Sequence, residues 1–260
     1  MSSFFDAVEM APRDPILGLN EQYLADPNPA KVNLGVGVYF DENGKLPLLK
    51  CVRAAEAAMA EAPKPRGYLP IDGIAAYDLA TQTLVFGADN PARKSGRVAT
   101  VQAVGGTGGL KVGADLLKRM SPGAKVLISD PSWENHRALF EGAGFDVGSY
   151  PYYDSSRHDV DFAAMRAGLE AAAPGTIVVL HACCHNPTGC DLTPAQWAEV
   201  VAVLVEVAFD RLHSGTLKLS TQCWVGVWGV EMSVDEVSSL GARWNVLGEG
   251  SLMHFREGVV

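Results

Sequence analysis

The stretch "KVLISDPSWENHRALFEGAGFDVGSY" (125–150) decides the fold class of this 260-residue chain. It begins with an apolar run typical of a buried strand (125–130) and continues with a helical pattern that a glycine closes (133–144). Strand-like residues return at 145–153. Because a strand, a helix and a second strand follow one another directly, the stretch predicts a βαβ unit with parallel strands.

The same alternation extends to both sides of this unit. The other predicted strands are 97–104 and 175–183, and the other predicted helices are 49–62, 73–87, 109–120, 161–172 and 193–208. The last of these helices has Thr193 as its N-cap and Pro194 at its first helical position. The sequence therefore predicts an α/β fold, a mostly parallel sheet with helices on both faces.

Composition disfavours several classes of partner. The formal net charge is −9 and no basic cluster stands out, so neither nucleic acid nor an anionic membrane is expected to bind. The start of the chain has no basic segment followed by an apolar run, and no apolar stretch approaches the roughly 20 residues of a membrane span. We therefore expect a cytoplasmic location.

The five cysteines are odd in number and fit reduced thiols better than a disulfide framework. A zinc site at His181, Cys183, Cys184 and His185 is an alternative use for two of them. Adjacent cysteines lack the usual C-x₂₋₄-C spacing and would point apart on a strand. We therefore expect no metal.

Composition changes near residue 208. All fifteen prolines lie at or before Pro194, and Ala242 is the only alanine after Ala208. Residues 220–237 allow a strand followed by a helix, but their periodicity is weak. No packing is predicted for 209–260.

The glycine stretch "VGGTGGLKVG" (104–113) leaves a predicted strand and opens a helix. Backbone N–H groups and the positive end of the helix dipole would meet there, which suits a phosphate, with the Thr107 hydroxyl as a further donor. A tight strand-to-helix turn that needs glycine for a positive φ explains the same residues. The stretch matches neither G-x-G-x-x-G with an acidic ribose partner nor the P-loop pattern.

Two more candidates follow predicted strands. Trp133 comes directly after "SDPS" and could offer a flat face to an aromatic ligand, although a tryptophan at the rim of the core looks the same. Asn186 precedes a proline and could donate to a ligand oxygen, although Asn-Pro alone is a turn signal. An anion cradle, a stacking face and an oxygen donor together indicate a phosphorylated aromatic ligand.

At this point the sequence closely resembles the aspartate and aromatic amino acid aminotransferases, fold-type I enzymes that use pyridoxal 5′-phosphate. The resemblance covers about residues 4–205. It rests on the blocks "APRDPILGL" (11–19), "KVNLGVGVYFDENGKLPLL" (31–49), "YLPIDG" (68–73), "GGTGGL" (105–110), "DPSWENH" (130–136) and "HACCHNPTG" (181–189).

The resemblance implies roles for several residues. Backbone groups of Gly105, Gly106 and Thr107 would hold the cofactor phosphate, and Trp133 would stack on the pyridine ring. Asn186 would donate to the phenolic oxygen and lie close to the substrate carboxylate. The other implied positions are Gly37 in the substrate-carboxylate loop, His136 and His181 beneath the ring, and Tyr68 at the phosphate of the neighbouring subunit's cofactor. A homodimer with shared sites follows, with an amino acid and a 2-oxo acid as substrates.

The resemblance also implies a division of the chain. Residues 1–14 match an N-terminal arm, 15–47 the first part of a small domain, and 48–207 part of the cofactor-binding large domain. Residues 208–260 form a tail that does not match, so we expect the homologous part to be truncated near residue 207. This expectation makes the predicted fold an incomplete large domain with an N-terminal arm.

The groups that such enzymes need for turnover follow the "HNPTG" block. They are a carboxylate in a D-x-A-Y segment, a lysine in an S-x-S-K segment and a later arginine. Here no D-x-A-Y segment follows, and Lys218, the only lysine after Asn186, has neither the spacing nor the neighbours of the family lysine. No catalytic residue is therefore assigned. The competing functions are an impaired aminotransferase and a non-catalytic homologue that only binds cofactor or pairs with intact subunits. A nucleotide-binding module would explain the glycine turn alone.

Overall fold

The structure is a computed structural model that describes residues 8–9, 15–32, 41–209 and 219–222. It divides into two compact units, Met1–Lys64 and Pro65–Val260. The first unit contains α1 (Pro15–Ala25) and α2 (Lys50–Glu61), and α2 buries none of its residues. Of the predicted arm (1–14), only the exposed residues 8 and 9 are described, and the rest lies outside the described residues.

The second unit alternates helices with strands. Its helices are α3 (Ala75–Phe86), α4 (Pro91–Lys94), α5 (Gly105–Met120), α6 (Glu134–Gly142), α7 (Phe162–Glu170) and α8 (Pro194–Phe209). Its strands are β1 (Lys125–Asp130), β2 (Asp146–Pro151), β3 (Tyr153–Asp154), β4 (Asp159–Val160), β5 (Ile177–His181) and β6 (Leu219–Gln222). Most of these elements overlap the predicted ones, while α4 and the short β3 and β4 strands were not predicted separately.

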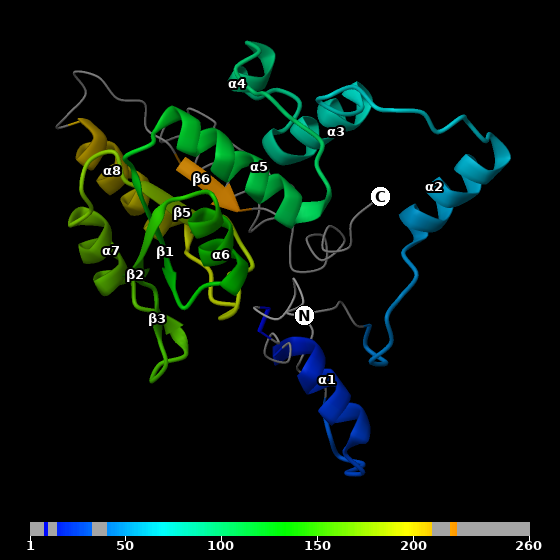
Figure 1. The fold of residues 1–260 in the computed structure, drawn as a ribbon, viewed down its shortest axis with the longest axis horizontal. Coiled ribbons are helices and arrows are strands. Elements are labelled where there is room, and N and C mark those ends of the chain that lie inside the picture. The colour runs from blue at the N-terminus through cyan, green and yellow to red at the C-terminus, as the bar shows by residue number, and fades with distance from the viewer. Residues whose placement is uncertain (1–7, 10–14, 33–40, 210–218, 223–260) are drawn as a thin grey trace, which may run out of the picture. The chain divides into compact units, whose positions relative to one another are not determined.

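The main sheet is parallel throughout and has the order β2-β1-β5-β6 in the described part of the chain (Figure 1). β1 pairs with β2 from Lys125↔Asp146 to Asp130↔Pro151, as the βαβ prediction requires. β6 pairs with β5 from Val178↔Leu219 to His181↔Gln222. The predicted α/β fold with a parallel sheet is therefore confirmed, and the tail contributes a strand at 219–222.

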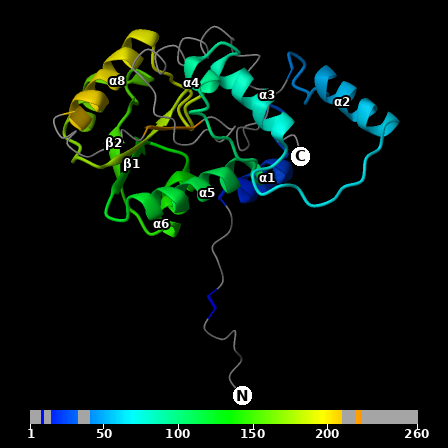
Figure 2. The same cartoon turned by 90° about the horizontal axis from the view of Figure 1, so that it is seen from above.

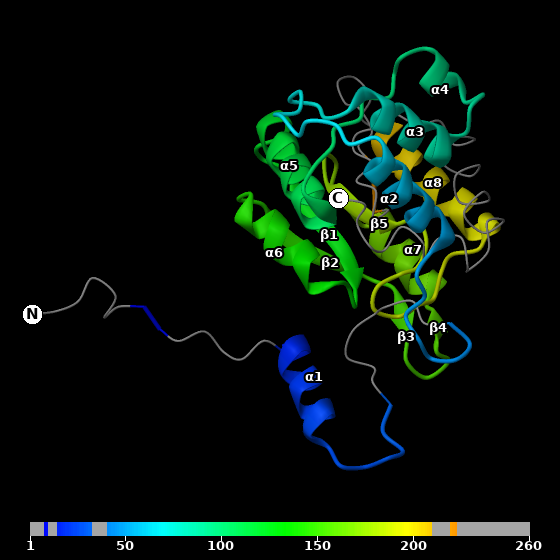
Figure 3. The same ribbon diagram turned by 90° about the vertical axis from the view of Figure 1, so that its right-hand side faces the viewer.

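Helices cover both faces of this sheet. α5 and α6 lie on one side of the strands, and α7 and α8 lie on the other (Figure 2, Figure 3). All five residues of β5 are buried, and the first four alternate between two apolar clusters. Val178 and Leu180 pack with residues of α7 and α8, whereas Ile177 and Val179 pack with residues of α5 and α6. Alternation between two covered faces explains why this strand reads as an unbroken apolar run.

The strand predicted at 97–104 is wrong, because this segment forms no strand in the structure. Its hydrogen bonds lead to α3 and to the loop before it instead of to a ladder. Gln82 Nε2 donates to Thr100 Oγ1 at 2.9 Å, and Gln102 N donates to Asp72 O at 2.9 Å. The partly covered side of this extended segment consists of Val98, Thr100 and Gln102, while Val101 and Val104 are exposed.

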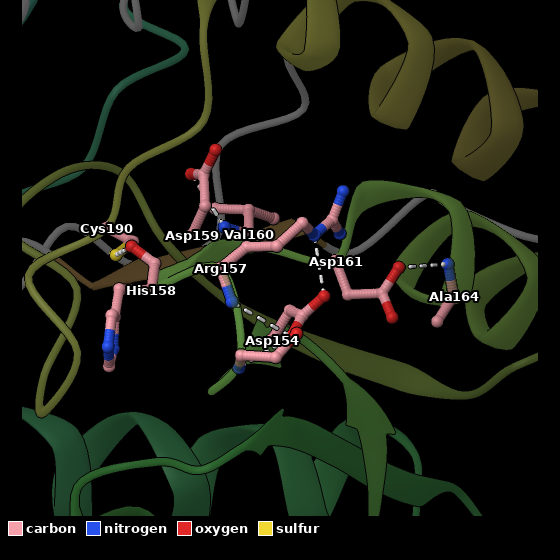
Figure 4. A network of polar contacts seen from close by, with 9 residues as sticks. Asp154, Arg157, His158, Asp159, Val160, Asp161, Ala164 and Cys190 are labelled. Atoms are coloured by element: carbon pink, nitrogen blue, oxygen red, sulfur yellow. Dashed lines mark hydrogen bonds and ion pairs between the residues drawn. The ribbon is translucent and has the colours of Figure 1, made fainter.

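β3 and β4 form an antiparallel hairpin whose turn is organised by Asp154 (Figure 4). Its carboxylate accepts hydrogen bonds from Ser156 N at 2.8 Å and from Arg157 Nε at 2.6 Å. Hydrogen bonds from Ser156, and then from Arg157, hold the pKa of this carboxyl below its usual range. Cys190 Sγ lies 3.4 Å from His158 O, so the hairpin is linked to the segment that follows β5 (Figure 4).

Candidate functional site

The carboxyl ends of β1 and β5 lie side by side, because the two strands are parallel neighbours. β1 ends at Asp130 and leads to Trp133, while β5 ends at His181 and leads to the loop that carries Asn186. In an open parallel sheet, ligands bind outside this edge. Both predicted side chains therefore follow strands that end at the same edge.

The predicted anion cradle is the first turn of α5, which begins at Gly105 rather than after the glycine turn. Gly105 has φ +62°, and a Cβ built there would meet nothing within 4 Å, so glycine is required by conformation and not by space. Gly108 N donates to Val104 O at 3.2 Å. The amides of Gly105, Gly106 and Thr107 precede that bond and have no acceptor within the helix. This geometry suits an anion.

Trp133, His136 and His181 form a chain of ring contacts. Trp133 is half-buried at the N-cap of α6 and meets the His136 ring edge-on, with centroids 5.4 Å apart. His136 is fully buried and lies 5.0 Å from the His181 ring, also edge-on. Ser132 Oγ lies 2.8 Å from His136 Nδ1 and fixes the orientation of that ring. Three of the predicted site residues are thus brought together.

His181 carries buried polar atoms that nothing in the described part of the chain satisfies. Neither of its ring nitrogens has a hydrogen-bond partner there. Burial, with smaller contributions from His185 and His136, holds the pKa of His181 well below its usual value. The ring is therefore neutral at neutral pH, with one nitrogen able to donate and one able to accept.

His185 also belongs to these ring contacts, although the sequence offered it only as a ligand of the disfavoured zinc site. Its Nε2 lies 2.9 Å from Ser129 Oγ on β1, and its Nδ1 lies 2.8 Å from Thr188 Oγ1 in the following loop. The ring stacks on Tyr152, with centroids 3.8 Å apart and planes 9° apart. Burial, and then His136, lowers its pKa to about 4. The sequence feature that points to it is its position in the block 181–189, four residues after His181 and directly before Asn186.

The remaining predicted residues lie apart from these ring contacts. Asn186 is half-buried in the loop after β5, and its side chain makes no hydrogen bond with the described residues. Tyr68 is fully exposed. Gly37 lies outside the described residues. The cradle is described by its own geometry alone, in the first turn of α5.

The described ranges of the chain lack two general features. They contain no group of three or more His, Cys, Asp or Glu side chains arranged to hold a metal ion. No helix in this part of the chain is long and apolar enough to cross a membrane.

Comparison with known proteins gives consistent matches. Residues 29–249 match the family described as aminotransferase class I and II. An aspartate aminotransferase of Pseudomonas aeruginosa is 61% identical over 202 residues, covering 78% of this chain and 51% of that protein. The aromatic-amino-acid aminotransferase of Escherichia coli is 48% identical over 201 residues, covering 77% of this chain and 51% of that protein.

A solved structure gives the same result. The aromatic-amino-acid aminotransferase of Burkholderia pseudomallei, covalently bound to pyridoxal phosphate, aligns with a TM-score of 0.78 and 47% identity over 98% of this chain and 74% of that chain. The chain spans about half the length of the curated relatives it matches, with 51% of each covered in the two cases above.

The family match covers most of the chain, the parallel sheet agrees with the solved relative, and the polar residues gather where such a sheet binds ligands. The chain therefore belongs to the aminotransferase class I and II family.

Proposed function

We propose that this chain binds pyridoxal 5′-phosphate at the carboxyl edge of its sheet. Its family activity would be the transfer of an amino group between an L-amino acid, aspartate or aromatic, and a 2-oxo acid. The observation that carries the proposal is the chain of ring contacts from Trp133 through His136 to His181, next to the loop of Asn186. The relative from Burkholderia pseudomallei that is bound to this cofactor supports it.

The residues present fit the phosphate and the ring of the cofactor. The first-turn amides of Gly105, Gly106 and Thr107 would bind the phosphate through hydrogen bonds and the helix dipole. Trp133 would stack on the ring, and the Asn186 amide would donate to its phenolic oxygen. The unpartnered nitrogens of His181 fit a buried site that a further polar group completes. When bound, the cofactor supplies an electron sink for amino acid chemistry.

The substrate-binding residues in this proposal are Gly37, Trp133 and Asn186. The two relatives named above act on aspartate and on aromatic amino acids, so both classes belong to the proposal. Tyr68 would reach the cofactor phosphate of a second copy in a homodimer, and its full exposure in the single chain is compatible with that role. A cytoplasmic location is also proposed, in line with a structurally similar aspartate aminotransferase from the cytoplasm of Saccharomyces cerevisiae.

We expect this 260-residue chain by itself to show little or no turnover. Lys218 is the only lysine after Asn186, and it lies outside the described residues. Without a lysine at the ring, no side chain moves the proton between the substrate and the cofactor, a contribution of roughly 10²–10⁴ in rate. The second candidate function is therefore a non-catalytic homologue that binds cofactor or pairs with intact subunits. The exposed side chains of Tyr68 and Ile71 favour such pairing.

The first test is binding and labelling of the purified chain. Pyridoxal phosphate is added, binding is followed by absorbance, and inorganic phosphate is used as a competitor. Borohydride reduction and peptide mass mapping then locate any pyridoxyl-lysine. We expect binding that phosphate competes away, weakened at least several-fold by Trp133→Ala and unchanged by the control Thr83→Val, whose hydroxyl bonds only within α3.

Two outcomes would change this view. A folded chain without phosphate-competed binding would contradict the cofactor site. Stoichiometric labelling of Lys218 would contradict the expected lack of turnover, because the tail would then supply the missing lysine.

A further inference from the structure

The loop after β5 is closed by its own polar groups. In residues 184–191, which we call the Asn186 loop, the Asp191 carboxylate accepts hydrogen bonds from Cys184 N at 2.8 Å and His185 N at 2.9 Å. Gly189 N donates to His185 O at 2.7 Å. These bonds give the loop a defined shape, but none of them attaches it to the sheet.

His185 makes that attachment. One ring nitrogen meets Ser129 on β1, while the other meets Thr188 within the loop. The face of the ring stacks on Tyr152, which directly follows β2. One buried imidazole therefore contacts the ends of two neighbouring strands and the loop itself.

Tyr152 strengthens the same attachment from the other end of the loop. Its hydroxyl donates to Cys190 O at 2.7 Å. Burial raises the pKa of Tyr152 far above its usual value, so the hydroxyl stays protonated and remains a donor. The side chain of Asn186, by contrast, has no hydrogen bond with the described residues and depends on its backbone for its position.

We propose that His185 is a positioning residue that fixes the Asn186 loop to β1 and to the segment after β2, so that the Asn186 amide is presented to the cofactor oxygen. Without the ring hydrogen bonds the loop would lose its link to Ser129 on β1 and would keep only the contacts at its other end, such as the one from Tyr152 to Cys190 O, even with Asp191 intact. The second half of this proposal rests on the proposed function, because it assigns Asn186 to the cofactor. The first half concerns the chain alone.

Hydrogen exchange measured by mass spectrometry tests the first half without cofactor. His185→Phe keeps the stacked ring but removes both hydrogen bonds, and Ser129→Ala removes the one that ties the ring to β1. We expect the amides of the Asn186 loop to exchange about tenfold faster in His185→Phe and less markedly faster in Ser129→Ala, since each bond contributes modestly to holding the loop. Peptides from α7 and the control Thr83→Val should be unchanged.

Loop exchange within twofold of the parent chain in His185→Phe would overturn the proposal. If His185→Phe accelerates exchange throughout the chain, Ser129→Ala decides, because of the two ring bonds it removes only the one to β1. Faster exchange confined to the loop supports the proposal, and unchanged exchange overturns it.

The absorbance maximum of bound pyridoxal phosphate tests the second half. Asn186→Ala should shift it, His185→Phe should shift it in the same direction, and the double variant should add little, because both act on one contact. Additive shifts would overturn the link to Asn186. If the parent chain does not bind the cofactor, the proposed function fails while the exchange result for the loop still stands.

Discussion

Gly73 is held in a conformation that only glycine adopts easily. Its φ is +102°, and a Cβ built there would lie 2.3 Å from the Cβ of Gln102. Gln102 is itself fixed, because its side-chain oxygen accepts a hydrogen bond from Ile74 N and its backbone N–H donates to Asp72 O. Any side chain at this position would therefore cause both backbone strain and a steric clash.

Gly73→Ala should lower the free energy of unfolding by about 2–3 kcal/mol. Gly67→Ala is the matched control, since a Cβ at Gly67 meets nothing within 4 Å. Chemical denaturation of both variants, followed by circular dichroism, gives the comparison. Equal free energies of unfolding would mean that the loop at Gly73 can move away from Gln102 without loss of stability.

Asp191 accepts hydrogen bonds from two backbone N–H groups and thereby holds the conformation of the Asn186 loop. Asp191→Ala should cost about 1–2 kcal/mol, because both amides lose their acceptor. Asp191→Asn retains one acceptor oxygen and should cost less. Denaturation curves for the two variants check this order, and the reverse order would assign the effect to charge instead of to the hydrogen bonds.

The place of Trp133 and Asn186 after two strands was predictable, because each follows an apolar run and the strand ends of a parallel sheet meet at one edge. His185 was not predictable in the same way. Its partners Ser129 and Tyr152 come from other strands, and sequence spacing gives no distance between strands. The pairing of β1 with β5 supplies that distance.

At the scale of elements, α7 depends on apolar residues that face the sheet. Leu169 in α7 is fully buried, whereas Leu116 in α5 is 51% exposed. Leu169→Ala should therefore cost about 2–5 kcal/mol, and Leu116→Ala no more than about 0.5 kcal/mol. Thermal or denaturant unfolding measures both. A loss of similar size in the two variants would contradict the assignment of α7 to the buried face.

The elements were predicted where periodicity and end signals agreed. β1 occupies the predicted range (125–130), and α8 starts at Pro194 as its cap signals indicate. The segment 97–104 misled, because alternating exposure arises equally from a strand and from an extended chain lying on a helix. α5 begins earlier than predicted, at Gly105, because the glycine turn itself leads into the helix, with Gly105 at a positive φ that glycine adopts easily.

At the scale of the whole molecule, stability should depend on pH through the buried histidines. The pKa of His185 is lowered from 6.5 to about 4, and that of His181 is lowered as well. A lowered pKa in the folded state means that the unfolded chain binds more protons as the solution is acidified. The stability that the neutral His185 contributes is therefore fully present above pH 6.5 and is lost as the pH falls towards about 4.

The decrease in the free energy of unfolding that is due to His185 should be on the order of 3 kcal/mol over this pH range. Unfolding free energies measured between pH 4 and pH 7 should show it, and His185→Phe should have a shallower dependence over that range. An unchanged slope in the variant would assign the acid sensitivity to other groups.

The order of strands has a consequence for how the chain is synthesised. β5 lies next to β1, yet it follows β2 in the sequence and is buried on both faces. When β1, α6 and β2 have left the ribosome, the long-range contacts that complete the interior still await residues 177–181. The nascent chain thus carries an unpaired sheet edge during that interval, and such edges make folding intermediates prone to misassembly.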